Sequence, residues 1–104
     1  MSRVHISSPF IRSFSQSDTT VGTSFVEVLA PMPPEGKCIT TIIQNKSSTA
    51  TIEVIFGDTG TVNNPTNGVV LQPLTIFSLD NYNGPVRVKA SATGTVVHAA
   101  RGTV

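Results

Sequence analysis

Apolar and polar residues alternate along much of this chain with a period of two, and this pattern constrains the fold more than any other feature. Segments 50–56 and 86–92 show the alternation most clearly, which predicts strands with one face on a core. No window of a dozen residues carries the i, i+3, i+4 apolar stripe of a helix. The core-facing residues predicted in the two segments are Ala50, Ile52, Val54, Phe56, Val86, Val88, Ala90 and Ala92.

Further strands are predicted where short runs are apolar on both sides, which indicates that both of their faces are contacted. Such a strand lies either in the middle of a sandwich or at a surface covered by a neighbouring subunit, and the sequence leaves both open. Turn residues such as Gly, Pro and Asn separate the strands, and Thr93-Gly94 is predicted to close a tight hairpin. Short strands at this spacing, without helices between them, predict an all-β fold, a small antiparallel β-sandwich or jelly-roll-like barrel. The runs are 25–30, 38–43, 74–79 and 96–100.

The 104 residues suit one domain, which we expect to span 21–104. Residues 1–20 differ in character, because serines there surround Ile6, Phe10, Ile11 and Phe14. We expect this segment to be an extended N-terminal arm that docks onto a neighbouring molecule. An edge strand of the same domain is an equally open alternative.

The composition excludes several classes of partner. Only 12% of the residues are charged, the net charge is +1, and the lysines and arginines are scattered, so no nucleic acid is expected. No run approaches the ~18 apolar residues of a membrane span, and the first residues lack the apolar core of a signal peptide. Cys38, the one cysteine, lies in an apolar run and is expected to be buried.

The string Asp58-Thr59-Gly60 matches the tripeptide that carries the catalytic aspartate of aspartic proteases. A dimeric aspartic protease is a remote alternative, because Gly57 precedes the string, a long polar loop follows it, and the supporting apolar-apolar-Gly-Arg segment is absent. A turn after a strand is the preferred interpretation. The chain is therefore expected not to be an enzyme.

No metal or cofactor is expected, since His5 and His98 have no cluster of Cys or carboxylates at ligand spacing. Tyr82 stands on a turn between two asparagines. Its ring either contacts a partner or packs over the end of the sandwich, and the sequence leaves both open.

The order of segments across 21–101 resembles that of small β-rich virion proteins of tailed bacteriophages. The matching elements are an Ile-Gln-Asn strand end followed by serines, a Phe-Gly strand end, an Asn-Gly turn leading to Leu-Gln-Pro, and an Asp-x-Tyr-x-Gly-Pro-Val turn. They are found at 42–50, 55–57, 67–73 and 78–86.

The resemblance implies a non-enzymatic structural protein of the virion, most simply a capsid decoration or cement protein on the capsid surface, made in the host bacterial cytoplasm. Its partners would be the major capsid protein or other virion proteins, and a homo-oligomer, preferably a trimer, is expected. A tail or head-fibre subunit, or a module that binds host-surface glycans, is the alternative. The interface candidates are Ile6, Phe10, Ile11, Phe14, Tyr82, Val96 and His98.

Overall fold

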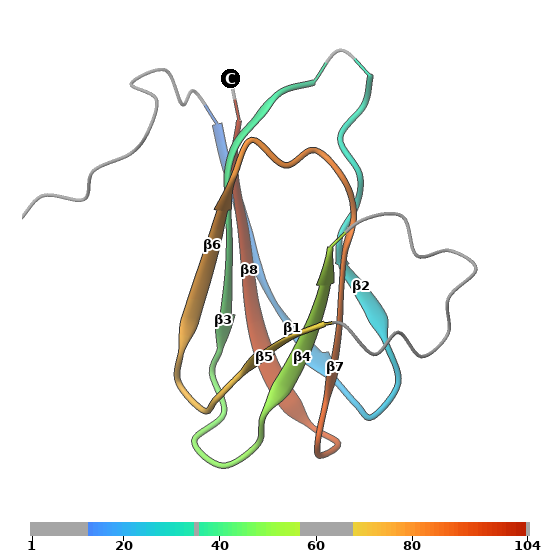
Figure 1. Cartoon of the computed structure of the whole chain (residues 1–104), viewed down its shortest axis with the longest axis vertical. Helices are drawn as coiled ribbons and strands as arrows, with labels where there is room; N and C mark the ends of the chain where they lie inside the picture. Colours follow the sequence, from blue (N-terminus) through green and yellow to red (C-terminus); the bar gives the residue numbers. More distant parts are fainter. Residues whose placement is uncertain (1–12, 35, 57–67, 104) are drawn as a thin grey trace, which may run out of the picture.

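The computed structural model describes residues 13–34, 36–56 and 68–103, and these form two antiparallel four-stranded sheets packed face to face (Figure 1). The first sheet has the order β1-β8-β3-β6 and the second the order β2-β7-β4-β5. The predicted all-β sandwich is thereby confirmed. The strands are β1 (Ser13–Val21), β2 (Val26–Leu29), β3 (Cys38–Asn45), β4 (Ile52–Phe56), β5 (Val69–Leu71), β6 (Ile76–Asp80), β7 (Val86–Ala90) and β8 (Thr95–Thr103).

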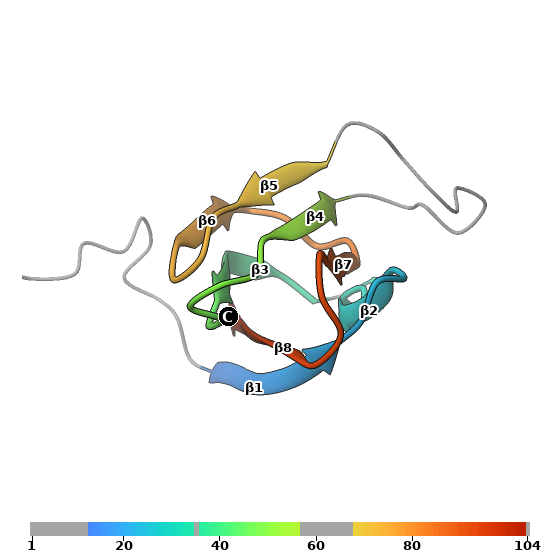
Figure 2. The same ribbon diagram turned by 90° about the horizontal axis from the view of Figure 1, so that it is seen from below.

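The strand pairs are nested in a way that defines a jelly roll. Strand β1 pairs with β8, β2 with β7, β3 with β6, and β4 with β5, each pair antiparallel. Pairing of β8 with β3 and of β7 with β4 then joins these ribbons into the two sheets. In Figure 2, β1 and β2 lie on one side of the sandwich and β5 and β6 on the opposite side.

The core lies between the sheets and is built from alternate residues of the inner strands, as the period of two requires. Val54, Val86, Val88 and Val97 are completely buried there. Two predicted inward residues behave differently: Phe56 is half-buried against the core, and Ala92 lies past the end of β7 and is exposed.

Residues 13–20 correct the predicted arm, because the structure places them in β1, paired with β8 from Ser13↔Thr103 to Val21↔Thr95. For residues 13–20 the alternative prediction, an edge strand of the same domain, is therefore the one that the structure shows. The serine-rich sequence of β1 shows no apolar alternation. None is needed, because most of β1 lies at a sheet edge with both faces exposed. Residues 1–12 lie outside the described residues.

The predicted hairpin at Thr93-Gly94 is also corrected. Gly94 adopts the left-handed φ of 86° expected of a tight turn. However, the strands that it connects, β7 and β8, belong to different sheets. Turn residues fix the reversal of the chain and do not decide which strands pair across it.

Candidate interaction surfaces

The structure places three of the four described interface candidates on one sheet face. Phe14 is exposed on β1, while Val96 and His98 are half-buried on the outer face of β8, opposite the core-facing Val97 and Ala99. Of the described candidates, Phe14, Val96 and His98 thus share the outer face of the first sheet, and Tyr82 does not. Ile6, Phe10 and Ile11, like the Asp58-Thr59-Gly60 string, lie outside the described residues.

Tyr82 packs over the end of the sandwich, which is the second of its two interpretations. Its ring meets Phe56 edge-on at a centroid distance of 5.5 Å. Its hydroxyl donates to the Pro85 carbonyl oxygen at 2.5 Å. The residue is therefore held in the loop between β6 and β7 and presents no free aromatic platform of the kind that binds sugars.

Asp18, His98 and Lys46 form a small charged cluster on the outer face of the first sheet. The Lys46 ammonium donates to Asp18 Oδ2 at 2.8 Å, and His98 Nδ1 lies 2.7 Å from Asp18 Oδ1. The register places Asp18 directly opposite His98. Hydrogen bonds from Lys46 and then from His98 hold the pKa of the Asp18 carboxyl below its ordinary value of 3.8.

An NMR titration is expected to show this lowered pKa, and Lys46→Met is expected to raise it because the largest cause of the shift is removed. Since the folded pKa is below the unfolded one, the stability contributed by the cluster is complete above the ordinary pKa. It is lost as the pH falls through the lowered value. A native Asp18 pKa at or above 3.8 would contradict the geometry.

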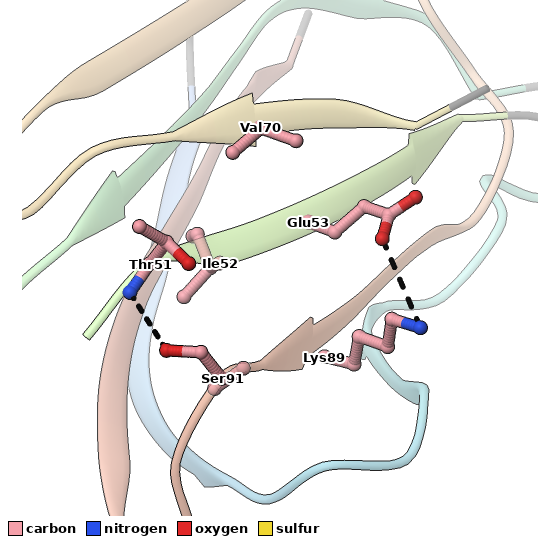
Figure 3. A pocket seen from close by; sticks show the side chains of 7 residues that line it. Thr51, Ile52, Glu53, Val70, Lys89 and Ser91 are labelled. Carbon is pink, nitrogen blue, oxygen red and sulfur yellow. Dashed lines mark hydrogen bonds and ion pairs between the residues drawn. The ribbon is translucent and has the colours of Figure 1, made fainter. Parts of the chain in front are cut away.

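A shallow hollow of about 140 Å³ lies on the outer face of the second sheet (Figure 3). Lys89 Nζ lies 3.8 Å from Glu53 Oε1 at its rim and 5.0 Å from the centroid of the Phe25 ring. The amide of Thr51 donates to Ser91 Oγ at 3.0 Å. These polar groups are thus paired within the hollow.

Two further side chains that could carry chemistry, those of Cys38 and Arg101, are buried and contact polar groups of the interior. Cys38 is 1% exposed, and its Sγ lies 3.3 Å from Thr41 Oγ1. Arg101 is buried, and its guanidinium donates to the carbonyl oxygens of Ala30 and Gly84 at 2.6 and 2.7 Å. Within 13–34, 36–56 and 68–103, no three His, Cys, Asp or Glu residues are placed to hold a metal ion, and no helix is long and apolar enough to cross a membrane.

Large exposed apolar side chains, in contrast, gather at the two open sides of the sandwich. We call these the β5–β6 side, residues 69–80, and the β1–β2 side, residues 13–29. On the β5–β6 side Val70, Leu74 and Ile76 are 57, 61 and 60% exposed. On the β1–β2 side Phe14 and Val26 are 44 and 37% exposed.

The four inner strands carry none of the large exposed apolar residues found in the described part of the chain. Edge strands have unpaired backbone groups in addition. Within the described part of the chain, the two open sides therefore combine sheet edges with apolar contact area, which is what a protein partner requires.

Comparisons with known proteins support the fold. No protein-family model and no curated protein sequence matches the chain. Among solved structures, the chain is similar to one from Bacillus endospore appendages, which form a family of disulfide-linked pili. The TM-score is 0.55 at 12% sequence identity, and the match covers 99% of each chain. This likeness is one of fold.

Sequence reasoning did not single out Val26, Val70, Leu74 or Ile76 as surface residues. Val26, Leu74 and Ile76 lie in the runs 25–30 and 74–79, for which the sequence left a core strand and a subunit-covered surface both open. Val70 lies in the segment of the predicted Asn-Gly turn. Only the strand order shows that these runs are edges, and strand order depends on pairings between distant segments. Leu74 adopts a left-handed φ of 64° between β5 and β6, a conformation that the sequence does not reveal.

Proposed function

We propose that this protein is a non-enzymatic structural subunit of an assembled particle. The observation that carries the proposal is the confinement of exposed large apolar side chains to the β1–β2 and β5–β6 sides of the described sandwich. Catalysis requires a group held beside a partner that activates it. The polar groups found together here are an exposed charged cluster and a rim ion pair, and both suit a surface.

The particle favoured by the sequence is a bacteriophage virion. The order of turn motifs resembles small virion proteins, and the jelly roll is a fold that viral capsid domains use repeatedly. In this role the subunit decorates the capsid surface, contacts the major capsid protein, and associates with its own copies, with a trimer favoured. Many moderate contacts repeated by symmetry would resist internal pressure through avidity.

A fibre subunit is the second candidate, and the fold shared with a pilus protein favours it. The endospore pili are disulfide-linked, whereas Cys38 is the one cysteine among these 104 residues and is buried. A fibre of this chain would therefore be held by non-covalent contacts.

Density-gradient purification of particles from the source, followed by mass spectrometry, tests the proposal. The chain is expected to band with assembled particles, and heads prepared without it are expected to rupture at a lower temperature until the purified protein is added back. Banding with tails or fibres would favour the second candidate. Recovery of the chain only among unassembled proteins would end both.

A further inference from the structure

We propose that copies of this chain join head to tail, with the β6 edge of one copy forming antiparallel backbone hydrogen bonds with the β1 edge of the next. This inference rests on the proposed function as an assembly subunit and names its first partner, a second copy of the chain. In the described residues, β1 and β6 are the two edges of the first sheet.

The hydrogen bonds between β3 and β6 show which backbone groups of β6 point away from the sheet. The amide of Asn45 donates to the Thr75 carbonyl at 2.9 Å, and the amide of Asn81 donates to the Ile39 carbonyl at 3.0 Å. Odd-numbered residues of β6 therefore bond to β3, because both backbone groups of a residue in an antiparallel ladder point to the same side. The even-numbered residues point theirs away from the sheet: Ile76, Ser78 and Asp80.

The same reasoning applies to β1. The Lys46 amide donates to the Val96 carbonyl at 3.0 Å, so even-numbered residues of β8 bond to β3 and odd-numbered ones to β1. The register between β1 and β8 pairs odd with odd. Even-numbered residues of β1 therefore also point their backbone groups outward: Phe14, Gln16, Asp18 and Thr20.

Strand direction makes these two edges complementary. Strand β1 is antiparallel to β8, β8 to β3, and β3 to β6, so β1 and β6 run in opposite directions. A second copy placed beside the first in the same orientation thus continues the antiparallel sheet. This contact also brings the β5–β6 side of one copy against the β1–β2 side of the next, so that both apolar sides are covered. A symmetric β6–β6 dimer would leave Phe14 and Val26 exposed.

The charges of the two edges are also compatible with the head-to-tail pairing of β6 with β1. Strands β1 and β6 contain no Lys, Arg or Pro, the residues with which natural proteins protect free edges. Asp80 is the one charged residue of β6. The Lys46 ammonium already compensates the carboxylate of Asp18 on β1. The head-to-tail contact therefore opposes no uncompensated like charges.

A head-to-tail contact closes into a ring or runs on as an open chain, depending on the rotation between copies. A closed trimer would suit capsid decoration, and an open chain would suit a fibre. Both outcomes use the same β6–β1 contact.

The test uses two proline variants of the full chain. Ser78→Pro removes an outward amide from β6, and Gln16→Pro removes one from β1, while neither breaks a bond inside the sheet. Light scattering after size exclusion is expected to show oligomers for the wild type and only monomers for each variant alone. An equimolar mixture is expected to give a dimer and nothing longer, because each variant keeps the edge that the other lacks. Ser78→Ala and Gln16→Ala keep the amides and are the matched controls.

Several outcomes would overturn the inference: a monomeric wild type at every concentration, oligomers of Ser78→Pro, or a dimer of Gln16→Pro alone, which would indicate β6–β6 pairing. If circular dichroism shows a proline variant to be unfolded, Ile76→Lys replaces the first and Phe14→Lys the second. Both positions are exposed, so a lysine there opposes pairing and leaves the core intact. A monomeric wild type that still bands with particles would refute this contact and leave the proposed function standing.

Discussion

Replacing Asn45 with alanine is expected to lower the free energy of unfolding by about 3 kcal/mol, because buried carbonyl groups that lose their donor cost about 1–3 kcal/mol each. The side chain is completely buried. Its Nδ2 lies 2.8 Å from the Ala50 carbonyl oxygen and 3.3 and 3.2 Å from those of Leu71 and Gln72. Its Oδ1 accepts from the Ser47 amide at 3.0 Å. One side chain thus joins the β3–β4 turn to the end of β5.

Urea unfolding followed by circular dichroism measures this effect as a lower midpoint at an unchanged slope. Gln44→Ala is the matched control, because Gln44 is the neighbouring residue on the outer face and is only half-buried. Such a surface change is expected to stay within about 0.5 kcal/mol. Equal losses for the two variants would show that the buried amide does not hold the turn.

The sequence motifs that carry the resemblance to virion proteins have mainly structural roles in this fold. Asn45 satisfies backbone groups of two elements. Ser47 Oγ accepts from the amides of Thr49 and Ala50 in the same turn. In the 80–86 turn, Asn83 Oδ1 accepts from the Cys38 amide at 2.8 Å. These motif residues therefore stabilise the turns of this fold.

The periodicity of β4 and β7 was predictable because each lies inside a sheet with one face on the core, where alternation is obligatory. Strand β1 was not, since its exposed serines carry no pattern, and β5 is only three residues long. The apolar runs of β2 and β6 left a buried strand and a subunit-covered surface both open, and the structure places the two strands at edges. Local sequence gives the strands, whereas the surface that they leave open depends on how distant strands pair.

Gly84→Ala is expected to lower the free energy of unfolding by about 1–3 kcal/mol, the usual cost of forcing an extra methyl group into a packed site. A Cβ at Gly84 would lie 2.6 Å from Tyr82 Cζ, and the ring is held by Phe56 and by its bond to the Pro85 carbonyl.

Gly22→Ala is the control for Gly84→Ala, because no atom lies within 4 Å of the position that its Cβ would take. The decisive measurement is a double-mutant cycle by urea unfolding. In a Tyr82→Ala background the cost of Gly84→Ala is expected to fall to that of Gly22→Ala, since the opposing ring is gone. An undiminished cost would show that the Tyr82 ring is not what opposes a methyl group at position 84.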